Sequence, residues 1–305
     1  MIPELFYWLF NMSITASVVG GVILLIRLIK KIPRRVISLL WLIPFFRLWV
    51  PVGINGKYGL ISLLMRLSTK TAVFVPVGEL QSFSVMNSVM AADDYFPIEF
   101  KTYALGELFR VASVIWLIGF CACALTFTVL YVITVREMKG AKRLYGNVYT
   151  SDKITSPAVY GVFKPRVVIP EALCDNVNLK YYLMHENAHI KRLDNFWRIV
   201  AFLTAALHWF NPFCWIFLKC FLNDLELSCD EKVLQSCGDD ERKNYALALV
   251  SFEEEKTLFV SAFGGAKIRT RVERILSFSK ISVASAVVFG LMIAATAYIL
   301  LTNAG

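Results

Sequence analysis

The sequence predicts a mainly α-helical, polytopic membrane protein with four transmembrane helices and a cytoplasmic α+β domain. Hydrophobic residues make up 57% of its 305 residues and the mean hydropathy is +0.58, too apolar for an ordinary soluble domain. The net charge is +9, and residues 136–280 hold 21 of the 32 lysines and arginines. In so apolar a chain basic residues mark cytoplasmic loops, so we expect no direct nucleic-acid partner.

The first span is predicted from about Leu5 to Ile26, long enough to cross a bilayer. Glu4 precedes it, and a cluster of lysines and arginines between Arg27 and Arg35 follows it. By the positive-inside rule the N-terminus lies outside and the basic cluster inside. A cleaved signal peptide would carry its positive charge before the apolar run, so this reading is rejected.

The second span is predicted over residues 36–52, which completes a membrane unit of residues 1–52. Pro44 and Arg47 interrupt this stretch, which is compatible with a full crossing or a re-entrant hairpin. We favour a crossing because residues 53–103 look external: they are mixed in polarity and read as an extracellular loop. This loop has no cysteine, so no disulfide constrains it.

The third span is predicted within residues 104–135 and the fourth within 281–305, which places the C-terminus outside. Arg136 and the basic residues after it mark a cytoplasmic exit, so residues 136–280 form the cytoplasmic body. Five of the seven cysteines lie in this body and none forms a C-x-x-C motif. This usage fits a reducing compartment and argues against disulfides and a cysteine zinc site.

The body begins with a β-rich segment, residues 144–170, which predicts two or three short strands. Pro157, Gly161 and Pro165 punctuate it, and prolines confine strands to edges or turns. An edge strand is a place where an extended substrate can add a strand. A small structural hairpin is an equally good interpretation.

A helix predicted from Leu179 to about Leu193, with Asn178 as its N-cap, carries the central motif of the chain. His185, Glu186 and His189 form H-E-x-x-H, which holds two of the three histidines of the sequence. Histidines four residues apart share a helix face and can bind one Zn²⁺ ion, while the glutamate serves as general base. The motif alone also occurs by chance in unrelated helices.

Residues 196–222 predict a membrane-dipping helical hairpin that Asn211-Pro212 splits, with Asn211 as cap. We expect it to enter the inner leaflet or to pack against the spans without crossing. A crossing would put the basic residues after it outside, against the charge rule. His208 lies at this hairpin and is kept as a candidate neighbour of the site, although a packed histidine is the commoner role.

A catalytic zinc site usually has three protein ligands, so two histidines are too few. Glu226 on a later helix is the candidate third ligand, and Asp230, one turn on, can hydrogen-bond an imidazole N–H. Asp194 can also hydrogen-bond a ligand histidine, or it can cap the end of the helix that carries the H-E-x-x-H motif. An exposed acidic helix face is the competing interpretation for Glu226 and Asp230. The apolar neighbours argue for burial, and buried carboxylates need partners. These neighbours are Leu225, Leu227, Cys229 and Val233.

Together, the motifs SPAVYGVFKPRVVIP, LMHENAHIKRLDNFWRI, LHWFNPFCW and DLELSCDEKVL resemble the BlaR/MecR-type family of integral-membrane zinc metallopeptidases, the antirepressors of beta-lactam resistance. The resemblance covers nearly the whole chain. It implies a zincin-like gluzincin domain with His185, His189 and Glu226 as zinc ligands, Glu186 as base and Asp230 in support. It also implies kinship with membrane CAAX prenyl proteases, which share the H-E-x-x-H and E-x-x-x-D arrangement.

The resemblance further implies a bacterial plasma-membrane endopeptidase whose substrate is a cytoplasmic repressor or its own 264–280 segment, with a homodimer as one possible assembly. Well-studied family members carry a penicillin-binding sensor domain after the last span; this chain stops there, so we expect no sensing through an acylated serine. The alternative function is a non-proteolytic signal transducer with a structural zinc site.

Overall fold

A computed structural model describes residues 2–50, 103–138, 140–251, 267–280 and 282–302. Residues 53–102 of the predicted extracellular loop lie outside the described residues. The helices are α1 (Ile2–Arg27), α2 (Arg34–Leu40), α3 (Leu42–Trp49), α6 (Tyr103–Glu137), α7 (Leu179–Lys191), α8 (Asp194–Leu207), α9 (Pro212–Ser236), α10 (Asp239–Ser251), α12 (Ile268–Leu276) and α13 (Val283–Leu301). The strands are β1 (Lys142–Tyr145), β2 (Val148–Ser151), β3 (Ala158–Tyr160) and β4 (Arg166–Pro170), followed by a short 3₁₀ turn, Glu171–Leu173.

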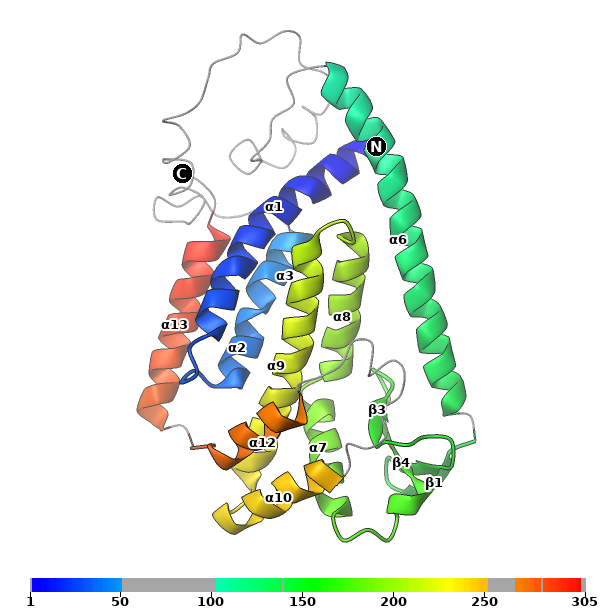
Figure 1. Cartoon of the computed structure of the whole chain (residues 1–305), viewed down its shortest axis with the longest axis vertical. Helices are drawn as coiled ribbons and strands as arrows, with labels where there is room; N and C mark the ends of the chain where they lie inside the picture. Colours follow the sequence, from blue (N-terminus) through cyan, green and yellow to red (C-terminus); the bar gives the residue numbers. More distant parts are fainter. Residues whose placement is uncertain (1, 51–102, 139, 252–266, 281, 303–305) are drawn as a thin grey trace.

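Three of the described helices are long and apolar enough to cross a membrane. They are α1, the Gly106–Arg136 part of α6, and α13. They coincide with the first, third and last spans predicted from the sequence. In Figure 1 they run along a bundle, with the sheet and the short helices gathered at one end of it.

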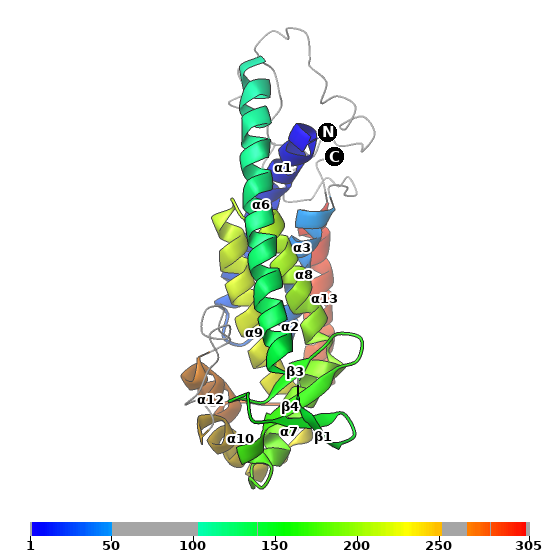
Figure 2. The same cartoon turned by 90° about the vertical axis from the view of Figure 1, so that its right-hand side faces the viewer.

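The predicted second span, 36–52, is not one long helix. It consists of α2 and α3, which follow one another along the bundle beside α1 (Figures 1 and 2). Trp41 between them keeps helical angles, φ −62° and ψ −20°, so residues 34–49 do not fold back as a hairpin. Pro44 explains the break, because a proline ring conflicts with the carbonyl four residues earlier, that of Leu40.

Arg47, in the middle of this apolar stretch, caps the end of α13. Its side chain is fully buried and donates to the carbonyls of Leu300, at 3.2 Å from Nε, and Thr302, at 3.0 Å from Nη2. The last carbonyls of a helix have no partner within the helix. The charge that interrupts the predicted span therefore joins α3 to the last helix.

Helices α8 and α9 form the predicted hairpin, and Asn211 caps α9 as expected, its Oδ1 accepting from Phe213 N at 2.9 Å. The hairpin packs against the candidate spans. At its turn, Nε2 of His208 donates to the carbonyl of Leu48 at 3.0 Å, which leaves Nδ1 to accept from Ser13 Oγ at 2.7 Å. The turn thus lies beside the end of α3 and the middle of α1.

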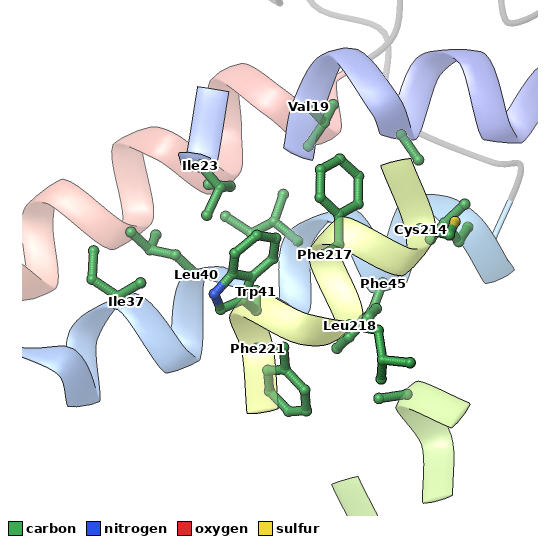
Figure 3. Close-up of a cluster of buried hydrophobic side chains, with 14 of the residues drawn as sticks. Val19, Ile23, Ile37, Leu40, Trp41, Phe45, Cys214, Phe217, Leu218 and Phe221 are labelled. Carbon is green, nitrogen blue, oxygen red and sulfur yellow. The ribbon is translucent and has the colours of Figure 1, made fainter. Parts of the chain in front are cut away.

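The largest core joins this hairpin to the first spans. Figure 3 shows Phe217 and Phe221 of α9 among apolar side chains of α1, α2 and α3. The ring of Phe217 lies directly on Gly20, where no side chain separates the two helices. Burial of large apolar side chains provides most of the packing energy of such a core.

A buried carboxylate connects α9 to the segment between α1 and α2. Asp224 is fully buried and accepts from Arg27 Nε at 2.8 Å, Arg34 Nη1 at 3.2 Å and Trp41 Nε1 at 3.0 Å. Two turns further along α9, Glu231 accepts from the backbone amides of Arg34 and Arg35 and so caps α2. The helix that carries Glu226 is therefore fixed to the first two apolar segments.

The β-rich segment forms a four-stranded sheet in the order β1-β2-β4-β3, where two or three strands were predicted. β2 and β4 are parallel, and β3 pairs antiparallel with β4 as an edge strand. The buried face of the sheet packs on α7 through Val148, Val167 and Ile169. On another side, α7 packs with α9, α10 and α12 around Tyr181 and Tyr245.

Candidate metal centre

Helix α7 presents two imidazoles toward α9, one helical turn apart. The helix begins after Asn178 as predicted, but the Asn178 side chain makes no capping hydrogen bond. The backbone amide of Asn178 donates to Oδ1 of Asn176. His185 and His189 are buried, and their Nε2 atoms lie 3.1 Å apart. Their rings are nearly perpendicular, at 89°. The i, i+4 spacing therefore brings both nitrogens to one point.

A tight turn after α7 brings a carboxylate back onto the second histidine. Oδ2 of Asp194, the first residue of α8, lies 2.6 Å from Nδ1 of His189, and Asp194 is 1% exposed. Leu193, just before it, has φ 56° and ψ 36°, the left-handed conformation that residues with a Cβ seldom adopt. Of the two roles considered for Asp194, the structure shows only the contact with a histidine, because Arg192 is the C-cap of α7 and Leu193 is the N-cap of α8.

A second network holds His185. Its Nδ1 lies 3.0 Å from the hydroxyl of Tyr245 on α10 and 3.2 Å from Oδ1 of Asp230. Tyr245 donates to Asp230 at 2.7 Å, so its oxygen is free to accept from the imidazole N–H. Arg271 of α12 donates twice to Asp230, at 2.7 and 2.8 Å. Burial alone would raise the pKa of Asp230, but the Arg271 guanidinium outweighs it and holds that pKa well below its usual range.

Because acceptors engage Nδ1 of both rings, each neutral imidazole presents its Nε2 lone pair to the shared point. The carboxylate of Glu226 faces the same point, with Oε2 3.5 Å from Nε2 of His185 and Oε1 3.7 Å from Nε2 of His189. Arg198 of α8 donates to Oε1 at 2.5 Å. Burial raises the pKa of Glu226, but His189, His185 and Arg198 together hold it well below its usual range.

Glu186, the residue between the two histidines in the motif, is almost completely buried. Burial raises the pKa of its carboxyl group, and the neighbouring His189 and His185 only partly offset this. A carboxylate with a raised pKa is a better proton acceptor near neutral pH than an exposed one.

The thiol of Cys229 is a second candidate third ligand. Suitable atoms of His185, His189 and Cys229 all lie within 4.8 Å of one another. The thiol donates to the backbone carbonyl of His185 at 3.3 Å. Sequence reasoning placed Cys229 only among the apolar neighbours of Glu226, although its place three residues on, nearly one helical turn, could have pointed to it.

The fold brings six of the seven predicted site residues together: Glu186, His185, His189, Glu226, Asp230 and Asp194. The seventh, His208, lies at the hairpin turn, where its ring nitrogens bond to Ser13 and Leu48. Tyr245 and Arg271 were missed. Tyr245 lies on α10, a helix without a marked apolar face, and Arg271 lies in a basic segment that is typical of a membrane-facing surface. Neither residue is therefore distinguished in the sequence.

The two imidazoles and the Glu226 carboxylate converge on one point, at separations close to those between ligands of one ion. Metal–ligand bonds of about 2.0–2.1 Å to nitrogen and oxygen give tetrahedral edges of roughly 3.3–3.4 Å. The two Nε2 atoms are 3.1 Å apart, and each faces a different oxygen of Glu226: Oε2 lies 3.5 Å from Nε2 of His185, and Oε1 lies 3.7 Å from Nε2 of His189. Two imidazoles and a carboxylate leave one position open for water or substrate, as in catalytic zinc sites.

Residues 7–275 match the family model described as BlaR1 peptidase M56. The chain belongs to the M56 peptidase family. The match confirms the resemblance drawn from the four motifs, and M56 membership implies a metallopeptidase-type protease.

Two curated M56-like relatives show the extent of the similarity. The chain is 28% identical over 158 residues to regulatory protein BlaR1 of Bacillus licheniformis, which is 48% of this chain and 26% of that protein. It is 28% identical over 103 residues to the methicillin resistance mecR1 protein of Staphylococcus aureus, 33% of this chain and 18% of that protein. The aligned part thus spans at most about a quarter of either relative.

Proposed function

We propose that this M56 chain is a membrane-embedded zinc endopeptidase that acts in transmembrane signalling. Its substrate is a cytoplasmic protein, either a transcriptional repressor or the chain's own 264–280 segment. The observation that carries the proposal is the convergence of His185, His189 and Glu226 on one point, with the buried Glu186 next to it. The relatives' names, a regulatory protein and a resistance protein, support a role in gene regulation and antibiotic resistance.

Glu226 is a better third ligand than Cys229. Each of its carboxylate oxygens faces one Nε2 atom at close to a tetrahedral edge. The thiol of Cys229 points its hydrogen at the His185 carbonyl, where it supports the backbone of α7. The His₂Glu set is also the one found in catalytic rather than structural zinc sites.

The chemistry divides between the ion and the protein side chains. A bound zinc ion would supply Lewis acidity for the scissile carbonyl and for the attacking water. Glu186 accepts the proton of that water and then delivers it to the nitrogen of the leaving amine. Asp194 and the Tyr245–Asp230 pair keep both imidazoles in the tautomer that exposes Nε2.

The decisive experiment compares the full-length wild type with Glu186→Gln in cells. Proteins whose cleavage depends on the wild type are identified by mass spectrometry of new N-termini, and the zinc content of both purified proteins is measured. We expect equal zinc content and loss of cleavage in the variant. Glu171→Gln, which changes an exposed glutamate in the same domain, is the matched control and should cleave normally.

The alternative, a non-proteolytic transducer with a structural zinc site, predicts a different pattern. Signalling would then persist in Glu186→Gln, and no cleavage product would separate the two strains. Cleavage at the wild-type rate by Glu186→Gln would rule out the mechanism proposed here.

A further inference from the structure

Asn195 connects the edge of the sheet with the turn that orients His189. It directly follows Asp194, whose carboxylate binds Nδ1 of His189 at 2.6 Å. The Asn195 side-chain amide donates to two carbonyls of the β3 segment, Val159 O at 2.9 Å and Gly161 O at 3.1 Å. Two consecutive residues therefore connect a metal-facing imidazole and a β-strand to the same short segment.

The two carbonyls lie on the side of β3 that faces away from the sheet, which we call its outward edge. Val159 is opposite Val167 in the antiparallel pair, yet the Val167 amide donates to Asn147 on the β2 side at 3.0 Å. Val159 and Val167 are thus a non-hydrogen-bonded pair, and the backbone of Val159 points away from β4. Gly161, two residues on, presents its carbonyl to the same Asn195 amide.

β3 also lies alongside the helix that carries the histidines. The side chain of Val159 packs in the cluster that contains Leu183 and Ile190 of α7, and Ile190 directly follows His189. The outward edge ends a four-stranded sheet and is connected to His189 through the two consecutive residues Asn195 and Asp194. Edge strands of this kind accept extended peptides by main-chain pairing.

We propose that Asn195 is a positioning residue that holds the outward edge of β3 where an extended peptide can pair with it beside His185 and His189. The inference rests on the proposed peptidase function and deepens it. The substrate is a flexible, extended segment read through its backbone amides, because Val159 and Gly161 each keep a second lone pair for a peptide N–H. A peptide without an N–H at the pairing position fits poorly.

The test uses the full-length, zinc-loaded protein in detergent with two metal-binding probes. A fluorescent, proline-free peptidyl hydroxamate reports metal binding plus strand pairing, and acetohydroxamate reports metal binding alone. Asn195→Asp keeps the shape of the side chain but has no N–H to donate, and Asn195→Ala removes the amide. Both variants should bind the peptidyl probe on the order of tenfold more weakly, because β3 loses the two hydrogen bonds within the protein that hold its edge in place for pairing. Acetohydroxamate binding and zinc content should not change.

Asn244→Asp, the same substitution at an exposed position of α10, is the matched control and should bind both probes like the wild type. A variant-free test covers the case in which the Asn195 variants do not fold. A peptidyl hydroxamate N-methylated at the pairing amide should bind the wild type on the order of tenfold more weakly than its parent.

The outcomes distinguish failure of the role assigned to Asn195 from failure of the proposed metal site. Suppose that the wild type binds both probes and that the Asn195 variants bind the peptidyl probe as well as or better than the wild type. Asn195 then either shields the edge of β3 or has no effect on it, and the inference is overturned. Equal binding of the N-methylated and parent probes overturns it as well. If the wild type binds neither hydroxamate, the proposed metal site itself fails and the inference fails with it.

Discussion

The carboxylate of Asp194 lies 2.6 Å from Nδ1 of His189, across a turn in which Leu193 adopts a left-handed conformation. A carboxylate in this position fixes the tautomer and increases the basicity of the imidazole. Asp194→Ala should therefore weaken zinc binding by about 10–100-fold. Asp194→Asn keeps an acceptor oxygen and should lose less.

Zinc affinity of these variants can be measured by competition with a chromophoric chelator. Asp152→Asn, a substitution of an exposed carboxylate in the same domain, should leave the affinity unchanged. Wild-type affinity in Asp194→Ala would show that this contact does not support the site.

The left-handed angle of Leu193 predicts an unusual order of stabilities. A residue with a Cβ in this conformation costs about 1–2 kcal/mol, whereas glycine adopts it freely. Leu193 is 58% exposed, so its side chain contributes little burial energy. Leu193→Gly should therefore be about 1 kcal/mol more stable than Leu193→Ala, which removes the side chain but keeps the strain. Thermal unfolding in one detergent compares the two, and a less stable glycine variant would contradict the prediction.

Zinc binding should depend on pH through the histidine pair. Burial alone would lower the pKa of His189, but the electrostatic effects of the nearby Cys229 and Glu226 and the hydrogen bond with Asp194 raise it to about 10. A raised pKa means that the metal-free site keeps its proton through neutral pH, so zinc must displace it. As the pH rises from about 6 to about 8, the zinc dissociation constant should fall roughly tenfold per pH unit for each proton that zinc displaces. A pH-independent constant, after correction for the competing chelator, would refute this.

The Asp224 cluster should be a major contributor to stability. Asp224→Asn leaves the largely buried Arg34 and the partly buried Arg27 without their carboxylate. Removing one partner of a buried ion pair costs about 3–5 kcal/mol. The expected result is a clear decrease in the melting temperature. Glu241→Gln, which breaks the exposed pair with Lys180, should have almost no effect. Similar melting temperatures for the two variants would contradict this assignment.

Two adjacent glycines of α1 give a matched pair of substitutions. A Cβ on Gly20 would overlap the ring of the buried Phe217, so Gly20→Ala should destabilise the protein by about 1–3 kcal/mol. A Cβ on Gly21 meets no described atom within 4 Å, so Gly21→Ala should be neutral or stabilising by up to about 1 kcal/mol. Gly20→Ala/Phe217→Leu should recover part of the loss. Equal stability of the two single variants would mean that α1 and α9 do not pack this closely.

Local sequence spacing was sufficient for the parts of the site that lie on one helix. His185 and His189 share a face because the α-helix repeats every 3.6 residues, and Glu226 and Asp230 do so for the same reason. The hairpin break at Asn211-Pro212 was readable because Pro suits the first helical position and Asn caps it. Apolar length alone predicted the three long helices.

Contacts between distant segments were not readable in the same way. Tyr245 and Arg271 reach the histidine pair from α10 and α12, and nothing in their own segments distinguishes them from surface or core residues. Pro44, the cause of the break in the second span, is visible in the sequence. How the break is accommodated depends on the packing of α2 and α3 against α1 and α9.

The sequence by itself determined the membrane class, the metal-binding motif and the family resemblance, because each depends on composition or on spacing within one helix. Tertiary structure decided that Glu226 faces both Nε2 atoms, that Asp194 holds His189, and that His208 lies elsewhere. The physical reason is that helical periodicity depends only on residues close together in the sequence. The approach of two helices, in contrast, depends on the packing of many side chains from distant segments at once.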